Sequence, residues 1–194
     1  MNHFYIHYGK RILDIAFVVC FVFLFSWLIV AIFLVYSITY EFPVFFSQLR
    51  IGKNQKPFTM VKFRTLSVNE QLTPHERRFL FGNFLRITNL DELPQLWNVL
   101  KGEMSLVGPR PLPVEYDKLF SETQQIRHTV RPGITGLAQV SGKNSISWQE
   151  KFEYDIHYVN RISFWLDCLI LFKTLTLALS IKRDVSLEED KFTG

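Results

Sequence analysis

Cysteine is scarce in this sequence, and its scarcity removes two classes of protein. The 194 residues include only Cys20 and Cys168, and neither stands in a CxxC or Cys/His spacing, which excludes a disulfide scaffold and a cysteine-based metal site. Each lies in an apolar run, which is typical of a buried thiol in a reducing compartment. Hydrophobic residues make up 48% of the chain, so intrinsic disorder is excluded as well. The chain has enough apolar surface to bury a core.

Charged side chains are missing from one long stretch near the N-terminus. From Ile15 to Tyr40 there is no Asp, Glu, Lys or Arg, and about 20 apolar residues are enough for a helix to cross a hydrocarbon core. A signal peptide has an apolar core of only about 7 to 15 residues before a small-residue cleavage site, and no such site stands out. A helix on a soluble core would offer a polar face, which is lacking here. Region 1–40 is therefore predicted to be a membrane anchor with a short N-terminal tail.

The orientation of this anchor is open to two interpretations. Basic residues stand on both of its flanks, at Lys10, Arg11, Arg50, Lys53 and Lys56. The positive-inside rule therefore gives no preference, and a re-entrant hairpin with both ends on the cytoplasmic side would show this symmetry. A simple span with a translocated tail is the alternative. A bend would fall near Ser26 and Trp27, although the segment contains no proline, the usual cause of a sharp kink.

After the anchor, the chain divides into a mixed α and β domain, 41–182, and a polar tail, 183–194. The runs VFFSQLRIG and PFTMVKFRTL flank the polar segment GKNQKP and predict a β-hairpin. Alternation places Lys62 and Arg64 on one face of its second strand. Two cations at this spacing are also common on a solvated strand, so the spacing alone does not indicate a site.

Three further segments predict helices. The run RFLFGNFLRI is amphipathic, and its helix is expected to end or kink around Gly82. Ser147 with Glu150 predicts a capping box that opens the next helix. The run ISFWLDCLILFKTLTLALSIKR is strongly apolar but interrupted by Asp167 and Lys173, so it predicts a helix that lies on the membrane or packs on the first segment.

The segment LDELPQLWNVLKG combines helix signals with two adjacent acids, Asp91 and Glu92. Pro94 is accommodated only in a first turn, so the helix is expected to start close to Asp91, with Asn89 or Asp91 as its cap and Gly102 at its end. A carboxylate at the positive end of the helix dipole tends to stay ionised. The plain interpretation is that the acids only cap the helix.

Arginines in rigid turns favour a second interpretation, an anion-binding site. Arg86 precedes the acids, and Gly-Pro-Arg-Pro at 108–111 and Arg-Pro-Gly at 131–133 follow them. Proline and glycine turns can hold an arginine in place for bidentate contact with phosphate. The net charge of +4 suits an anionic partner. A nucleic acid is a poor candidate, because the cations are scattered among turns rather than clustered on a helix.

Three ordered blocks resemble the small monotopic phosphoglycosyl transferases among the bacterial sugar transferases. They are KFRT at 62–65, LDELPQLWNVLKGEMSLVGPRPL at 90–112 and VRPGITGLAQVSGKNSISW at 130–148. The resemblance extends from KRILDI near the N-terminus to FWLD near the C-terminus. It implies a mostly helical α+β fold with a re-entrant membrane helix, a small β-hairpin and interfacial amphipathic helices. The catalytic domain is then expected on the cytoplasmic face of the bacterial inner membrane.

The resemblance also implies a reaction. Members of this family transfer a sugar 1-phosphate from a UDP-sugar to polyprenyl phosphate and release UMP, with Mg²⁺ and through a phosphosugar bound to an aspartate. This is the first membrane step of glycoconjugate synthesis, so the implied partners are both substrates, the lipid membrane and downstream glycosyltransferases, with no nucleic acid. An inactive, membrane-anchored protein that binds nucleotide sugars or acts as a scaffold is the alternative.

The resemblance assigns roles residue by residue. The catalytic pair falls on Asp91 and Glu92, with Asp91 as nucleophile and both as expected Mg²⁺ ligands. Arg86 matches an arginine that contacts phosphate in the family. The substrate- and phosphate-binding residues implied in this way are Lys62, Arg64, Arg86, Pro109, Arg110, Pro111 and Arg131. One departure concerns the anchor, where many relatives have a Ser-Pro pair and this chain has Ser26-Trp27.

Overall fold

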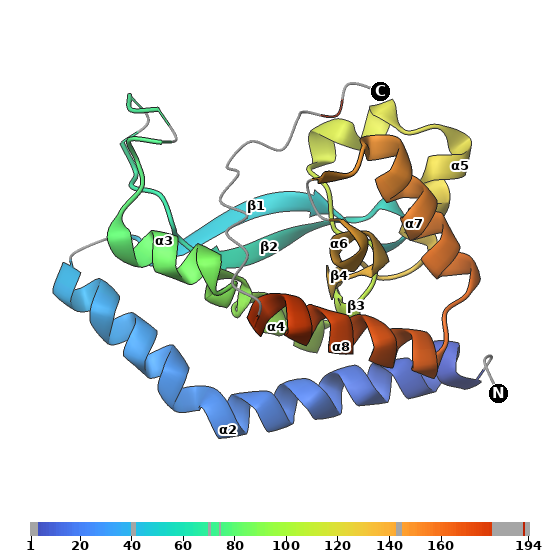
Figure 1. Ribbon diagram of the computed structural model, residues 1–194, viewed down its shortest axis with the longest axis horizontal. Coiled ribbons are helices and arrows are strands. Elements are labelled where there is room, and N and C mark those ends of the chain that lie inside the picture. Colours follow the sequence, from blue (N-terminus) through green and yellow to red (C-terminus); the bar gives the residue numbers. More distant parts are fainter. Residues whose placement is uncertain are drawn as a thin grey trace.

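The computed structural model describes residues 4–39, 42–69, 71–73, 75–142, 145–179 and 192. The α-helices are α2 (Lys10–Thr39), α3 (Leu80–Ile87), α4 (Gln95–Lys101), α5 (Glu122–Gln125), α6 (Leu137–Ser141), α7 (Trp148–Asn160) and α8 (Phe164–Leu179). The strands are β1 (Phe45–Ile51), β2 (Pro57–Phe63), β3 (Ser105–Val107) and β4 (Gly133–Thr135). This composition confirms the predicted α+β class. In Figure 1, α2 runs along one side, α3, α4 and α8 lie above it, and the β-hairpin and remaining helices lie beyond them.

Helix α2 is bent rather than straight. With the preceding π-helical turn it spans 35 residues and contains an 18-residue window of mean hydropathy 3.1, so it is long and apolar enough to cross a membrane. Its backbone leaves helical geometry at Phe25, with φ −117° and ψ 18°, and Figure 1 shows two arms at an angle. The bend falls beside Ser26, where the sequence placed it, and it forms without a proline. Phe23 and Trp27 near the bend are 83% and 64% exposed, as expected of side chains that face lipid.

Both arms of α2 pack against the same domain. The first arm enters the main core through Val18, while the second arm forms a separate cluster in which Ile32 and Tyr36 contact Phe63 and Leu85. Since both ends return to one body, the geometry favours a re-entrant helix over a straight span.

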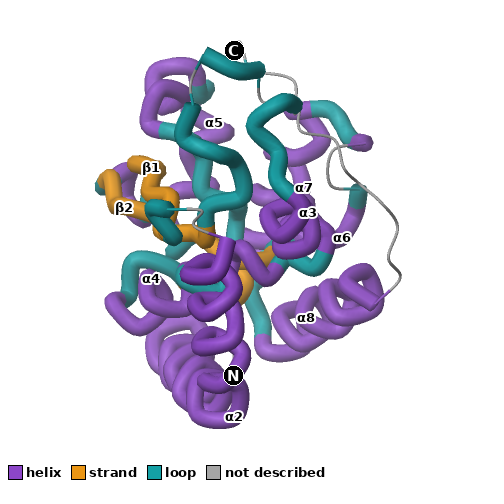
Figure 2. Tube along the Cα trace, turned by 90° about the vertical axis from the view of Figure 1, so that its left-hand side faces the viewer, coloured by secondary structure: helices purple, strands orange, loops and turns teal. Residues whose placement is uncertain are grey.

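The start of α2 is joined to α8 by a buried polar cluster. Asp167, only 4% exposed, accepts hydrogen bonds from Lys10 Nζ and Tyr5 Oη at 2.5 Å and from Tyr158 Oη at 2.8 Å. Asp167, one of the two charged residues that interrupt the apolar sequence of α8, therefore forms an internal ion pair with Lys10. Figure 2 shows α4 and α8 above α2, one on each side. The predicted α8 packs on the first segment, and its outer face exposes Trp165 and Phe172.

The predicted β-hairpin is present. Strands β1 and β2 pair antiparallel from Phe45 opposite Phe63 to Ile51 opposite Pro57, joined by the turn η2 (Lys53–Gln55). Phe58 and Met60 on the inner face of β2 are buried, and alternation puts Lys62 on that same face. Helix α4 docks on this strand, because Asn98 Nδ2 donates to Thr59 O at 2.8 Å.

A short parallel pair, β3 and β4, forms the centre of the domain. Ser105 lies opposite Gly133 and Val107 opposite Thr135. The backbones approach so closely that a Cβ on Gly133 would lie 2.1 Å from Gly108 N. Glycine is required at this crossing for space, and the crossing sets the direction in which the loop after β3 leaves the core.

Two local predictions are wrong in detail. Helix α3 neither ends nor kinks at Gly82 but continues to Ile87, and Gly82 is needed for packing, because a Cβ there would lie 2.5 Å from Thr65 O. Helix α4 begins at Gln95 rather than near Asp91. A separate 3₁₀ turn, η3 (Leu90–Glu92), precedes it, and neither Asn89 nor Pro94 makes a side-chain cap.

The other residues predicted to begin or end a helix are confirmed. Gly102 ends α4 with φ +84°, a left-handed conformation that favours glycine. Ser147 and Glu150 form the predicted capping box of α7. The predicted tail, 183–194, lies outside the described residues except for Phe192, which packs among Trp148, Phe152 and other aromatics.

Candidate active site

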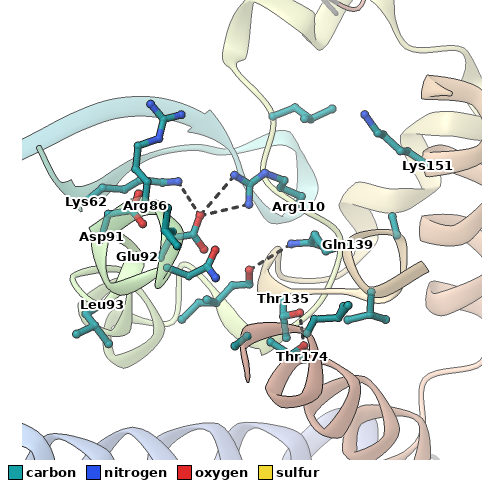
Figure 3. A pocket seen from close by; sticks show the side chains of 18 of the residues that line it. Lys62, Arg86, Asp91, Glu92, Leu93, Arg110, Thr135, Gln139, Lys151 and Thr174 are labelled. Atoms are coloured by element: carbon teal, nitrogen blue, oxygen red, sulfur yellow. Dashed lines mark hydrogen bonds and ion pairs between the residues drawn. The ribbon is translucent and has the colours of Figure 1, made fainter. Parts of the chain in front are cut away.

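A cavity of about 470 Å³ lies between α3 and η3 on one side and the helices α6, α7 and α8 on the other (Figure 3). It brings together five of the residues expected from the sequence, which come from four separate parts of the chain: Lys62, Arg86, Asp91, Glu92 and Arg110. The arrangement concentrates two carboxylates and three cations in one cavity.

Apolar neighbours hold the acidic pair in place. Asn89 adopts a left-handed conformation, φ 55°, and reverses the chain directly after α3. Leu90 and Leu93, on either side of the acids, pack onto the cluster that contains Tyr36 and Leu85. These leucines hold the turn on the core, and the acids between them line the cavity. Their placement depends on this turn and not on the first turn of a long helix.

Glu92 is the anionic centre of an ion-pair network. Its Oε1 accepts from Lys62 Nζ at 2.8 Å and from Arg110 Nη1 and Nη2 at 3.4 and 3.5 Å. Burial alone would raise the pKa of Glu92, but the charges of Lys62 and Arg110 outweigh it and lower the pKa to about 2. Glu92 is thus ionised at neutral pH and holds two cations at fixed positions (Figure 3).

Asp91 lies in a different electrostatic environment. Burial raises its pKa to about 6, and the charge of Glu92 adds to this effect, against the lowering influence of Lys62 and Arg86. The sequence predicted that a helix dipole would stabilise the ionised form of Asp91. This effect does not dominate the pKa, because Asp91 lies in a 3₁₀ turn and is largely buried. At pH 7 its carboxylate is mainly ionised but less stabilised than that of an ordinary aspartate, which suits a nucleophile.

The structure does not bring Arg64 or Arg131 to this cavity. Arg64 lies beyond the end of β2, where its Nε donates to Pro43 O at 2.9 Å. Arg131 Nε donates to Gly102 O at 2.8 Å, beside Arg11, which donates to the last carbonyls of α4. Both arginines therefore bind backbone carbonyls.

Pro109 and Pro111 shape the loop on which Arg110 stands. Pro109 O accepts from Gly133 N at 3.0 Å, and Pro111 O accepts from Arg50 Nη1 at 3.1 Å. These bonds tie the loop to β4 and β1 and leave the Arg110 side chain directed at Glu92. The prolines themselves are not among the residues that line the cavity.

A buried ion pair behind Arg110 was missed by the sequence analysis. Arg127 donates through Nη2 and Nε to Asp155 Oδ2 at 2.8 and 3.0 Å, and its Nη2 also donates to Arg110 O at 2.8 Å. The signal was the apolar spacing on α7, where Phe152, Asp155 and Tyr158 are buried on one face. An acid on a buried face needs a partner. Further lining residues that were not anticipated are Arg78, Asn83, Thr135, Gln139, Lys151 and Thr174.

The donor set fits a magnesium ion that arrives with its substrate. Among the described residues, no group of three or more His, Cys, Asp or Glu side chains could hold a metal. Asp91 and Glu92 supply carboxylates only, and Mg²⁺ is commonly bound by one or two carboxylates together with substrate phosphates. The Oε1 atom of Glu92 already contacts two cations, which leaves Asp91 as the more available ligand.

The family described as bacterial sugar transferase matches residues 5–180 of this chain. The chain belongs to that family. This sugar transferase is similar to the uncharacterized sugar transferase EpsL of Bacillus subtilis (strain 168), with 48% identity over 160 residues that cover 78% of this chain and 79% of that protein.

Several relatives have names that specify a reaction. The UDP-glucose:undecaprenyl-phosphate glucose-1-phosphate transferase of Escherichia coli (strain K12) is 39% identical over 181 residues, 86% of this chain and 39% of that protein. The UDP-N-acetylgalactosamine-undecaprenyl-phosphate N-acetylgalactosaminephosphotransferase of Aeromonas hydrophila is 37% identical over 186 residues, 88% of this chain and 44% of that protein. The sugar transferase spans less than half of the length of each.

Proposed function

We propose that this sugar transferase moves a sugar 1-phosphate from a UDP-sugar to polyprenyl phosphate and releases UMP. The observation that carries the proposal is the buried Asp91 carboxylate beside the Lys62–Glu92–Arg110 network, in a cavity that a membrane helix underlies. The printed names of the relatives agree with substrates of this class. Mg²⁺, held by Asp91 with Glu92 nearby, would neutralise charge on the diphosphate oxygens.

The reaction divides into two displacements at one phosphorus atom. In the first, an Asp91 oxygen attacks the phosphorus that carries the sugar, the P–O bond to the other phosphate breaks, and UMP leaves with the electron pair. In the second, an oxygen of polyprenyl phosphate attacks the same phosphorus, and the bond to Asp91 breaks. Lys62 and Arg110 are placed to bind phosphate oxygens during both steps. The water-soluble and lipid substrates then need not be bound together.

The proposed location follows from the anchor. The exposed apolar arms of α2 support a location at a membrane, and we propose the cytoplasmic face of the bacterial inner membrane, where UDP-sugars are made. The product, a polyprenyl-diphosphate sugar, is then a substrate for a glycosyltransferase that extends it.

The test uses the purified full-length protein with Mg²⁺, polyprenyl phosphate and a panel of UDP-sugars. We expect UMP release with at least one donor and none from Asp91→Asn. Glu115→Gln, which changes an exposed acid outside the cavity, is the control and should retain activity. Absence of UMP with every donor, or full activity of Asp91→Asn, would overturn the proposal and favour a binding or scaffold protein.

A further inference from the structure

One wall of the cavity takes no part in the network around Glu92. Arg78 stands two residues before α3 and lines the cavity, as do Asn83 and Arg86 of α3. Asn83 and Arg86 are three residues apart, so they share one face of the helix. This α3 wall (Arg78, Asn83 and Arg86) presents two guanidinium groups and an amide to the cavity. Such groups match the oxygens of a phosphate.

An apolar stripe runs beside the α3 wall. Leu80, Phe84 and Ile87 are 91%, 52% and 45% exposed, and their spacing places them along one side of α3. Ile87 also lines the cavity, so the stripe reaches its rim. Helix α3 packs on the second arm of α2, where Leu85 contacts Ile32 and Tyr36. The stripe therefore lies next to the apolar membrane helix.

The opposite rim is apolar too. Leu177 and Ala178 of α8 line the cavity across from α3, and Phe172 and Leu175 on the same helix are 65% and 63% exposed. The cavity thus opens between two helices that carry exposed apolar side chains. A ligand that enters here while part of it stays between the helices must have a long apolar portion.

Cations stand on both sides of the acidic pair. Lys62 and Arg110 contact Glu92, and Figure 3 shows Arg86 on the same side of the pair as Lys62, with Arg110 on the other side. The cavity can therefore hold two anions, one near Arg86 and one near Arg110, with the acidic pair between them. The α3 wall has an exposed apolar stripe on its own helix, whereas Lys62 stands on β2 and Arg110 on a loop. An anionic head on an apolar chain fits that wall, whereas a nucleotide has no use for the stripe.

We propose that Arg78, with Asn83 and Arg86, binds the phosphate of the lipid acceptor, while the Lys62–Glu92–Arg110 network receives the diphosphate of the donor. This assignment rests on the proposed function, because it names the subsite for one of its two substrates. Arg78 is then an acceptor-binding residue that never contacts the nucleotide.

The experiment measures binding and turnover separately with the full-length protein in detergent. Binding of polyprenyl phosphate, the uncharged polyprenol, inorganic phosphate and a UDP-sugar is measured for the wild type, Arg78→Ala, Arg78→Gln and Arg77→Ala. We expect Arg78→Ala and Arg78→Gln to weaken polyprenyl phosphate binding at least about tenfold, the usual cost of losing a hydrogen bond to a charged group. Binding of the UDP-sugar should be unchanged. Arg77→Ala is the matched control, because Arg77 is a neighbouring arginine that donates to Ser67 O outside the cavity.

Binding of polyprenol and of inorganic phosphate separates the contribution of the apolar chain from that of the phosphate group. We expect polyprenol binding to be insensitive to Arg78, and inorganic phosphate to bind far more weakly than the lipid, since it lacks the apolar chain. In turnover, the KM for polyprenyl phosphate should rise in Arg78→Ala without a change in the KM for the donor.

Two results would overturn the assignment. One is wild-type binding of polyprenyl phosphate by Arg78→Gln, which keeps a polar but shorter and uncharged side chain and so serves if Arg78→Ala does not fold. The other is a loss of UDP-sugar binding as large as the loss of lipid binding. A wild type that binds polyprenyl phosphate through Arg78 but releases no UMP from any donor would refute the proposed function and leave the lipid phosphate subsite standing.

Discussion

At the residue scale, neighbouring carboxylates acquire opposite properties from their surroundings. Glu92 faces Lys62 and Arg110 and is strongly acidic, whereas the pKa of Asp91 is raised because desolvation outweighs the charges of Lys62, Arg86 and Arg110. The pair therefore combines a permanent anion that organises cations with a carboxylate whose negative charge is poorly stabilised. The proposed roles, Asp91 as nucleophile and Glu92 as its supporting group, require such a division.

We expect the ionised Asp91 carboxylate to lower the free energy of unfolding and to be essential for activity. Its pKa is raised from 3.8 to about 6 in the folded state, so the folded protein holds the proton more tightly, and stability falls as pH rises through this window. Asp91→Asn removes the charge, and we expect it to raise the free energy of unfolding at pH 7 by on the order of 1–3 kcal/mol while abolishing UMP release. Thermal unfolding of both proteins at pH 4 and pH 7 measures the effect, which should nearly vanish at pH 4. A less stable variant at pH 7 would contradict it.

The same pKa predicts the pH dependence of the first displacement. UMP release requires an ionised Asp91, so kcat/KM for the donor should fall as pH decreases through about 6. Glu92, with a pKa of about 2, contributes no step in this range. A profile that stays flat down to pH 4.5 would show that Asp91 is not the group that must be ionised.

Replacement of Glu92 should disturb its cations rather than remove a reacting group. Glu92→Gln leaves Lys62 and Arg110 without their anion, and we expect kcat/KM to fall by about 10²-fold because small displacements of positioning groups have such effects. The folded state should lose about 1–3 kcal/mol as well. Steady-state kinetics and denaturant unfolding test both effects, again with Glu115→Gln as the control. Wild-type kinetics in Glu92→Gln would exclude this role.

At the scale of elements, the attachment of the membrane helix to the domain depends on charge. The first turns of α2 carry Lys10, Arg11 and Asp14, and each contacts a group in the domain: Asp167, the end of α4 and Leu106 N. An apolar helix cannot obtain a unique position from hydrophobic contact alone, since lipid also covers apolar surface. These polar contacts therefore set its register on the domain.

The Lys10–Asp167 pair offers a test of that attachment. The two side chains are 14% and 6% exposed, so removing one partner leaves a buried charge, which typically costs about 3–5 kcal/mol. We expect Lys10→Met and Asp167→Leu each to lower the melting temperature in detergent, and the double variant to be less destabilised than the sum of the two. Lys118→Met, at an exposed lysine of η4 (Val114–Leu119), is the control. Strict additivity would contradict a direct coupling between the two residues.

At the scale of the whole molecule, the bend in α2 predicts a membrane topology. Both arms pack on one domain, so both ends of the helix should lie on the same side of the membrane. A cysteine placed at Asn2, with Cys20 and Cys168 replaced by serine, should not react in intact cells with an impermeant thiol reagent. It should react after the cells are permeabilised. Labelling in intact cells would indicate a straight span with an external N-terminus.

The sequence by itself determined the elements and the kinds of group in the site. The uncharged stretch from Ile15 to Tyr40, the alternation in the β-hairpin and the capping box at Ser147 are local patterns, and local interactions suffice to produce them. The Asp91–Glu92 pair and the Pro-Arg-Pro loop could be recognised for the same reason. Local signals failed where a close tertiary contact decides, as at Gly82, which is a glycine because Thr65 O lies against it.

Only the tertiary structure decided which of these groups meet. Lys62 reaches Glu92 while Arg64, two residues later, lies beyond the end of the strand and binds a backbone carbonyl. Arg131 resembles Arg110 in its Pro-rich turn, yet it binds the end of α4. Arg78 joins the cavity although no sequence motif marks it. Contacts between residues tens of positions apart depend on how β2, η3, α3 and α8 pack together, and no short sequence pattern encodes that packing.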